Sequence, residues 1–419
     1  MALASKLHFV GIGGAGMAPL AALCRLSDRR VTGSDNQLNS KTEHLQSLGI
    51  EITSGHIADA MPDDTQMLIY SSAIPADNPE RQKAFQLGIP QLCRGAALAQ
   101  YSRDYRRVIA VSGAHGKSSI TSLIAHILKE TGFSPGFMIG ADLNGSCNYS
   151  RGNGDIFVTE ADESDGTHKL LSPWCGVIPN YDPDHAWSVG GEDQLKANFR
   201  EFAAKSENLI YYNFDEVRDF CSSKGVGLDI VPDDFEFANF YGYEAANAQI
   251  AVKTCELLGC PFDSAVRAAA SYPGIARRMT LKLQSENLVI IEDYAHHPTE
   301  VRNSLNLLRH KYSNYHLRVV FQPHRYARLE KFFDGFAEEL SKADTLFVAP
   351  VFAAWSESGK VNSDMLAEKC QGVAISSDWQ KSADEILRYP EDGRKLLVAV
   401  LGAGDINGIF PYLEGCIVR

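Results

Sequence analysis

The sequence predicts an α/β fold in which mostly parallel sheets are covered by helices. Short apolar runs that are typical of buried strands alternate with stretches of helical periodicity along the chain of 419 residues. Two glycine-rich loops each follow such a run and open a helical stretch, and a third strand–helix pattern starts near residue 289. This alternation favours parallel sheets, because each crossover between parallel strands places a helix on a face of the sheet.

The elements can be followed in chain order. The expected strands are residues 7–12, 67–70, 108–111, 156–159, 176–179, 209–212, 289–291, 317–321, 345–348 and 396–401. Helical periodicity covers residues 17–26, 79–87, 120–129 and 299–309. From the spacing of the motifs we expect three domains, over residues 1–106, 107–279 and 280–419.

The composition fits a globular enzyme, with 45% hydrophobic and 22% charged residues. The net charge of −12 argues against nucleic acid or an anionic membrane surface as the main partner. No run approaches about 18 consecutive apolar residues, so we expect no membrane insertion. The nine cysteines form no Cys-x-x-Cys pair, which favours a reducing, cytoplasmic location.

A first glycine loop follows the first expected strand. It reads Gly11-Ile12-Gly13-Gly14-Ala15-Gly16-Met17, and Asp35 ends the next strand. The glycines permit a tight turn and the approach of a pyrophosphate to a helix N-terminus, and the acid is placed for a ribose. The pattern by itself favours NAD over a turn without a ligand, although any nucleoside diphosphate offers the same two phosphates.

A second glycine loop, Gly113-Ala114-His115-Gly116-Lys117-Ser118-Ser119, stands between the expected strand 108–111 and the helix 120–129. Such a loop cradles a nucleoside triphosphate: backbone N–H groups face the phosphates, Lys117 reaches the β and γ oxygens, and the Ser118 hydroxyl holds Mg²⁺. Val111 stands where the general pattern has its first glycine, so an ordinary strand–helix turn is the alternative.

An acidic run follows the expected strand 156–159. Its four carboxylates are those of Glu160, Asp162, Glu163 and Asp165. They would repel one another unless a cation lies among them. A solvated acidic loop is the commoner outcome for such runs, but the position at a strand end after a phosphate loop favours Mg²⁺.

Histidines and arginines follow three later strands. The strings are residues 180–185, 292–300 and 321–328, and they contain His185, His296, His324, Arg325 and Arg328. Ligands bind at the carboxyl ends of parallel strands, and arginine pairs well with carboxylate or phosphate. A lone histidine is more often structural, and each cluster by itself could be surface charge. Two clusters in neighbouring strand–helix units favour a shared anion site.

Together and in this order, these strings resemble the Mur ligase family. The resemblance spans the whole chain and includes Asp184-His185 and the string Gly274-Ile275-Ala276-Arg277-Arg278. It implies a Rossmann-like UDP-sugar-binding domain over residues 1–106 and a shortened central P-loop ATPase-like ligase domain over 107–279. A C-terminal Rossmann-like domain over 280–419 would bind the amino acid. The NAD interpretation is then removed, because the first loop of this family holds the UDP pyrophosphate.

The resemblance implies ATP-dependent amide formation in peptidoglycan synthesis, with ATP and Mg²⁺ as cofactors. The lactyl carboxylate of UDP-N-acetylmuramate would attack the γ-phosphate, and the L-alanine amine would attack the resulting acyl phosphate. Catalysis of this kind is positioning and charge neutralisation. The enzyme is expected to be a monomer or a weak homodimer.

The resemblance also implies roles for single residues. The residues for ATP are Gly113, Ala114, His115, Gly116, Lys117, Ser118, Ser119, Asn247 and Arg278, and Arg277 is an alternative for the phosphate contact of Arg278. Those for the UDP-sugar are Gly11, Gly13, Gly14, Gly16, Met17 and Asp35. The metal ligands are Ser118, Glu160 and His185. The catalytic set is Lys117, His296, His324, Arg325 and Arg328.

The chain departs from the family pattern in three places. Ala114 and Ser118 replace threonines, and the stretch from residue 185 to 247 is shorter. Tyr243 and Glu244 replace the His-Asn pair of the adenine-site string, so that only Asn247 is left.

These departures leave alternatives open. They include a Mur-type ligase that adds another amino acid or a peptide, such as the tripeptide-recycling ligase, and a nucleotide-binding homologue with reduced ligase activity. An NAD-dependent oxidoreductase would leave Lys117, Glu160 and His185 unexplained. The string 322–326 favours the alanine-adding reaction.

Overall fold

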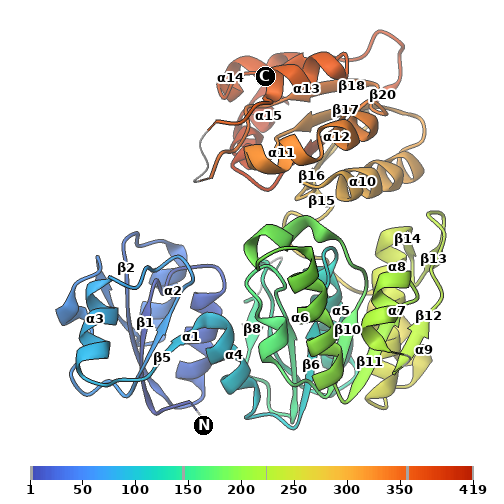
Figure 1. Cartoon of the computed structure of the whole chain (residues 1–419). Coiled ribbons are helices and arrows are strands. Elements are labelled where there is room, and N and C mark those ends of the chain that lie inside the picture. Colours follow the sequence, from blue (N-terminus) through green and yellow to red (C-terminus); the bar gives the residue numbers. More distant parts are fainter. Residues whose placement is uncertain (1–2, 144–146, 223, 355–357, 418–419) are drawn as a thin grey trace. The chain divides into compact units, whose positions relative to one another are not determined.

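The computed structural model describes residues 3–143, 147–222, 224–354 and 358–417. The chain forms two compact units, and each is described by itself. Unit 1 comprises Met1–Val231, Glu236–Phe240 and Glu244–Pro273; unit 2 comprises Pro232–Phe235, Tyr241–Tyr243 and Gly274–Arg419. Figure 1 shows three sheets with helices packed on them, which confirms the expected α/β class.

The first sheet of unit 1 is entirely parallel and has the strand order β3-β2-β1-β4-β5. Its strands are β1 (Lys6–Val10), β2 (Arg30–Asp35), β3 (Glu51–Ser54), β4 (Met67–Tyr70) and β5 (Gln91–Cys93). Its helices are α1 (Met17–Leu26), α2 (Ser40–Ser47), α3 (Pro79–Gln86) and α4 (Arg94–Ser102), with the 3₁₀ turn η1 (Ala58–Ala60). The strand order reverses between β1 and β4, so the loop after β1 lies at the switch point where such sheets bind ligands.

The second sheet of unit 1 has the order β12-β11-β10-β6-β9-β7-β8 and is parallel except for the pair β7–β8. Its strands are β6 (Arg107–Val111), β7 (Gly136–Met138), β8 (Tyr149–Ser150), β9 (Ile156–Glu160), β10 (Cys175–Ile178), β11 (Asn208–Tyr212) and β12 (Val226–Leu228). The helical segments are α5 (Lys117–Glu130), η2 (His168–Leu170), η3 (Pro183–Ser188), α6 (Glu192–Lys205), α7 (Asp215–Cys221), α8 (Tyr243–Leu257) and α9 (Phe262–Ala270). A small hairpin joins β13 (Glu236–Phe237) to β14 (Phe240–Tyr241). Strand β6 lies between β9 and β10, so the loop after it is flanked by the ends of both.

The two sheets of unit 1 share apolar packing. Phe157 of β9 is fully buried in the core cluster of the first sheet. Its ring stacks on Tyr105 with 4.9 Å between centroids and meets the edge of Tyr101 at 5.5 Å. The two glycine loops are therefore carried by one compact unit.

Unit 2 contains the third sheet, with the order β15-β16-β20-β17-β18-β19. Its strands are β15 (Thr280–Gln284), β16 (Leu288–Asp293), β17 (Tyr315–Phe321), β18 (Thr345–Val348), β19 (Val373–Ala374) and β20 (Lys395–Leu401). Its helices are α10 (Pro298–Lys311), α11 (Tyr326–Lys331), α12 (Phe333–Leu340), α13 (Ser363–Lys369), α14 (Trp379–Ile386), η4 (Ile406–Ile409) and α15 (Phe410–Ile417). Only β15 is antiparallel to its neighbour, and β20 lies between β16 and β17. The carboxyl ends of β16 and β17 therefore meet at one edge of the sheet.

Across the described ranges, no helix is long and apolar enough to cross a membrane. The eight cysteines whose side chains the structure describes are all free thiols.

Candidate active site

The first glycine loop is held against the end of β2. Gly11 has φ +78°, and the amides of Gly11 and Ile12 both donate to the carbonyl of Ser34. Asp35 Oδ2 accepts the Gly13 amide at 2.8 Å. The structure thus brings Asp35 to the glycines as expected, and one of its oxygens supports the loop itself. The Met17 side chain lies in the core, so a ligand would meet the backbone there.

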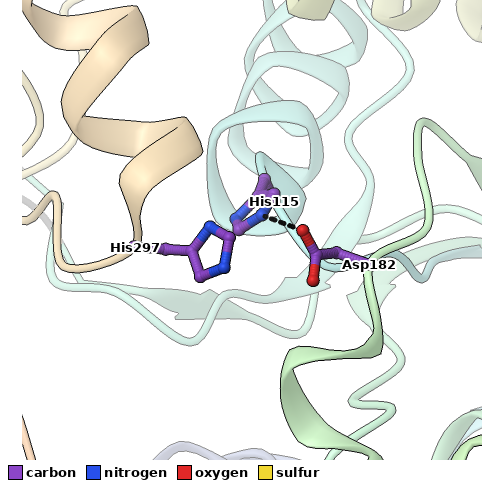
Figure 2. Close-up of side chains that lie close together, drawn as sticks. All are labelled: His115, Asp182 and His297. Atoms are coloured by element: carbon purple, nitrogen blue, oxygen red, sulfur yellow. Dashed lines mark ion pairs between the residues drawn. The ribbon is translucent and has the colours of Figure 1, made fainter. Parts of the chain in front are cut away.

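The second glycine loop is fixed from two sides. His115 exchanges hydrogen bonds with the Asn180 side chain, at 2.9 Å from its amide and 3.0 Å to its carbonyl. Its ring nitrogen Nε2 lies 3.7 Å from Asp182 Oδ2 (Figure 2). Gly116 has φ +82°, and a Cβ there would lie 2.9 Å from Asn247 Oδ1. Only glycine suits that conformation, and Asn247 of α8 is placed directly beside the phosphate loop.

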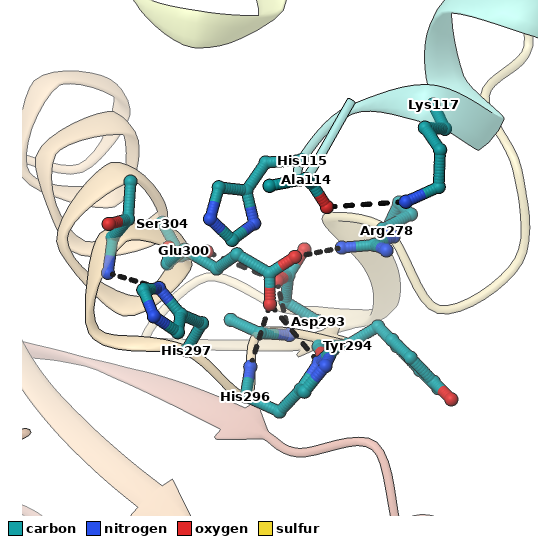
Figure 3. A network of polar contacts seen from close by, with 12 residues as sticks. Ala114, His115, Lys117, Arg278, Asp293, Tyr294, His296, His297, Glu300 and Ser304 are labelled. Atoms are coloured by element: carbon teal, nitrogen blue, oxygen red, sulfur yellow. Dashed lines mark hydrogen bonds and ion pairs between the residues drawn. The ribbon is translucent and has the colours of Figure 1, made fainter. Parts of the chain in front are cut away.

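Lys117 is folded back over its own loop. Its Nζ donates to the Gly113 carbonyl at 2.7 Å and lies 3.4 Å from the Ala114 carbonyl (Figure 3). It also pairs with Glu163 Oε1 at 2.9 Å, and that carboxylate is 1% exposed. Burial works against the ammonium, but the charges of Glu163 and Asp162 outweigh it and raise the pKa of Lys117. The lysine is therefore a permanent cation at the phosphate loop.

Ser118 and Glu160 come together at the ends of neighbouring strands. Val111 of β6 pairs with Glu160 of β9, so the start of α5 faces the Glu160 side chain. Glu160 Oε1 accepts the Gly140 amide at 2.6 Å, and the nearby Ser118 hydroxyl favours the charged form of the carboxylate. Burial raises the pKa of Glu160. A hydroxyl and a carboxylate are ligands that suit Mg²⁺. His185 lies in η3, and its side chain is outside the part that the structure describes.

The other acidic side chains of the run are neutralised by the chain itself. Glu163 pairs with Lys117, while Asp165 and Asp162 lie 2.5 Å and 3.8 Å from Arg94. Cations of the chain therefore lie among three of the four carboxylates, as their mutual repulsion requires, and Mg²⁺ at Glu160 stays a prediction. Arg94 belongs to none of the motifs described above, and its partners are about seventy residues away in the sequence. Its contact with the acidic run therefore could not be predicted from the sequence.

In unit 2, polar groups gather after β16. Asp293 accepts the Met279 amide at 2.8 Å, the Ala295 amide at 2.9 Å and the Ser304 hydroxyl at 3.1 Å. Burial raises the pKa of Asp293 to about 6. Glu300 Oε1 lies 3.6 Å from Arg278, and its Oε2 accepts the His296 amide at 3.0 Å (Figure 3).

His296 and His324 approach each other from the ends of β16 and β17. Their rings are 5.7 Å apart. Burial lowers the pKa of His296 to about 4, so this ring is neutral near pH 7. His324 Nδ1 lies 3.2 Å from Arg328 Nη1, and Arg325 starts α11 with the unusual φ of +70°. The structure thus brings the expected catalytic residues of unit 2 to one edge.

Arg277 and Arg278 differ in their surroundings. Arg277 pairs with Glu292 at 3.0 Å and donates to the carbonyls of Gly402 and Gly404. Its guanidinium therefore ties strand ends together. Within the described residues of unit 2, Arg278 forms an ion pair with one acidic side chain, that of Glu300. Arg278 stays our choice for a phosphate contact.

Acid sensitivity is expected near the acidic loop. His168 of η2 is fully buried, with its ring 4.9 Å from that of Phe199. Burial lowers the pKa of His168 to about 4. The folded state therefore gains stability above pH 6.5 that is lost as the pH falls from 6.5 through 4, up to about 3 kcal/mol. His168→Phe should flatten this part of the profile of unfolding free energy, measured by urea titration at pH 7 and 4.5. If His168→Phe leaves the pH dependence of the unfolding free energy unchanged, His168 is not the source of the acid sensitivity.

The comparisons with known proteins agree with this geometry. The family model described as "Mur ligase family, catalytic domain" matches residues 6–106, and "Mur ligase, glutamate ligase domain" matches residues 277–404. A UDP-N-acetylmuramate–L-alanine ligase of Carboxydothermus hydrogenoformans is 31% identical, over 98% of this chain and 96% of its own length. One from Sorangium cellulosum is 32% identical, over 97% and 95%.

A solved structure shares the fold. The UDP-N-acetylmuramate–alanine ligase of Thermotoga maritima has a TM-score of 0.80 at 24% identity, with 99% of each chain covered. Similarity over nearly the full length to ligases, together with two glycine loops in one unit, excludes the oxidoreductase alternative. The chain belongs to the Mur ligase family.

Proposed function

We propose that this chain is an ATP-dependent ligase that joins L-alanine to UDP-N-acetylmuramate in peptidoglycan synthesis. The observation that carries the proposal is the pair of glycine loops in unit 1, the second of which has Lys117, Ser118 and Glu160 converging beside it. Relatives at 31–32% identity that cover almost the whole chain carry the name of this reaction. The cytoplasmic location and the monomeric or weakly dimeric state stay predictions.

The chain's own groups have defined tasks in this reaction. The first glycine loop and the N-terminus of α1 would bind the UDP diphosphate, because their amides face an anion. Lys117 would leave Glu163 and bind the γ-phosphate as the lactyl carboxylate attacks it. Ser118 and Glu160 would hold Mg²⁺, which supplies charge neutralisation when bound.

The second step joins the amino acid. The L-alanine amine attacks the acyl phosphate, and phosphate leaves from the tetrahedral intermediate. In unit 2, Arg325 and Arg328 offer the charge to bind a carboxylate, with His324 beside Arg328, and the neutral His296 can accept a hydrogen bond. Orientation and charge neutralisation account for such a rate enhancement without a protein nucleophile.

The test is phosphate release with purified protein, ATP and Mg²⁺. We expect release only when UDP-N-acetylmuramate and L-alanine are both present. UDP-N-acetylglucosamine, which lacks the lactyl carboxylate, is the matched negative substrate. Release with L-alanyl-D-glutamyl-diaminopimelate and not with L-alanine would instead identify the tripeptide-recycling reaction. Release with neither would overturn the proposal.

The altered adenine string predicts weaker discrimination among nucleotides. Asn247 lies beside Gly116, and Glu244 is one turn earlier on α8. An ionised Glu244 offers only acceptors, whereas the adenine edge presents a donor and an acceptor. Losing one such hydrogen bond costs about 1 kcal/mol, and a buried unpaired group costs up to about 3 kcal/mol. Glu244→Asn should therefore tighten ATP binding several-fold and leave GTP binding unchanged, as measured by calorimetry. If the wild-type protein already binds ATP much more tightly than GTP, and Glu244→Asn does not change this preference, the segment does not form the adenine site.

A further inference from the structure

Arg94 connects the two nucleotide-binding regions of unit 1. It is the first residue of α4 and directly follows β5, so it lies at the carboxyl end of the first sheet, where the glycine loop also lies. A Cβ on Gly16 would lie 2.9 Å from Arg94 Cδ and 3.0 Å from its Nη1. The arginine therefore covers the last glycine before α1.

The other end of the Arg94 side chain belongs to the acidic loop of the second sheet. Its Nη2 donates to Asp165 Oδ2 at 2.5 Å and lies 3.8 Å from Asp162 Oδ2. Its side chain is 19% exposed, and the carboxylates raise the pKa of its guanidinium although burial lowers it. The next residue, Gly95, packs so closely on Thr167 that a Cβ there would overlap it.

The same acidic loop reaches Lys117. Glu163 stands between Asp162 and Asp165 in the sequence and pairs with Lys117 at the phosphate loop. The Arg94 side chain therefore packs on the first glycine loop, and ion pairs run from it to the acidic loop and from that loop to Lys117 at the second glycine loop. A change in which anion Arg94 binds would alter the surroundings of Lys117.

The first glycine loop has amides ready for an anion. Within the described ranges, the amides of Ala15 and Gly16 have no hydrogen-bond acceptor, and both precede the N-terminus of α1. A diphosphate bound there would lie against Gly16 and therefore against the Arg94 guanidinium. Arginine binds phosphate and carboxylate with the same fork of donors, so the two anions would compete.

We infer that Arg94 is a shared binding residue, for which the diphosphate of the UDP-sugar and the carboxylates of Asp165 and Asp162 compete. This inference rests on the proposed function, because it needs a nucleoside diphosphate at the first loop. Binding at the first loop is then linked to the acidic loop and, through Glu163, to the ATP site. Such linkage is reciprocal: each nucleotide changes the affinity for the other by the same factor.

The test uses two variants with opposite expected effects on the same affinity. Arg94→Ala should weaken UDP-N-acetylmuramate binding at least tenfold, because a charge-assisted hydrogen bond is lost. Asp165→Asn should tighten it several-fold, because the competitor for Arg94 is removed while the side-chain oxygen that accepts the Thr167 amide is kept. In the double variant the gain from Asp165→Asn should vanish. Calorimetry without ATP gives these affinities.

Controls separate this role from a structural one. Arg103→Ala, at the opposite end of α4, is the matched arginine control and should leave the affinity unchanged. Arg94→Ala should weaken the binding of UDP as much as that of UDP-N-acetylmuramate. It should not weaken the binding of uridine, which lacks the diphosphate. A structural role predicts that Asp165→Asn weakens binding, and that result, or an unchanged affinity in Arg94→Ala, would overturn the inference. If Arg94→Ala does not fold, Arg94→Lys and Asp165→Asn still test it.

The linkage has its own measurement. Saturating UDP-N-acetylmuramate should change the affinity of the wild-type protein for a non-hydrolysable ATP analogue at least threefold, and Arg94→Ala should bring that ratio close to one. Equal ratios in both proteins would overturn the linkage. A wild-type protein that binds neither UDP nor UDP-N-acetylmuramate would instead defeat the proposed function.

Discussion

Lys117→Ala is expected to abolish ATP-dependent phosphate release while leaving UDP-N-acetylmuramate binding nearly intact, within the few-fold change that the linkage through Glu163 allows. The lysine is a cation folded over the second glycine loop, with its Nζ 2.7 Å from the Gly113 carbonyl. Removing one preorganised charge that stabilises a transition state costs roughly 10²–10³-fold in rate. The UDP-sugar would bind at a different loop of the same unit, so its affinity, measured by calorimetry, should persist.

A second variant separates catalysis from packing. Lys117→Ala leaves the buried Glu163 without its ion-pair partner, which is destabilising. The double variant Lys117→Ala with Glu163→Gln removes that charge, so it should recover stability and not activity. Lys129→Ala, on the exposed last turn of the same helix, is the matched lysine control. Recovered activity in the double variant, or lost UDP-sugar affinity in Lys117→Ala, would contradict the assignment of Lys117 to the ATP phosphates.

The two glycine loops and the central strands could be predicted because local backbone geometry and apolar pattern define them. Helix 17–26 and strands 67–70 and 345–348 agree with α1, β4 and β18 residue by residue. The first strand was expected to reach residue 12 but ends at Val10, because Gly11 takes a positive φ and turns the chain. Strand β3 was not expected, since none of its side chains is buried and it has no apolar run.

The roles of charged residues were less predictable than the loops. Asp35, Ser118 and Glu160 could be placed because each lies at the end of a strand or the start of a helix that the pattern locates. Arg94 could not be placed, because its contact with Asp165 joins residues 71 apart, one after a strand of the first sheet and one after a strand of the second. Sequence spacing within one strand–helix unit therefore carried the prediction, and contacts between segments that follow different sheets could not be predicted.

Glu160→Gln is expected to lower ligase activity at least a hundredfold, and raised Mg²⁺ or Mn²⁺ should partly restore it. The amide is nearly isosteric and its oxygen can still accept the Gly140 amide, so the fold should survive. It lacks the negative charge that binds a divalent cation, so a larger metal concentration is needed to fill the site. The measurement is initial rate against metal concentration at saturating substrates.

A role of Glu160 in proton transfer would give a different result. In that case no concentration of Mg²⁺ or Mn²⁺ would restore the activity of Glu160→Gln, because the amide cannot carry the proton. Glu130→Gln, in the exposed last turn of α5, should leave both the rate and the metal dependence unchanged. Glu160 is half-buried and its desolvation raises its pKa, so binding of the cation must compete with a proton on the same oxygens. The metal requirement of the wild-type protein should therefore become steeper as the pH is lowered, and in Glu160→Gln this pH dependence should be lost.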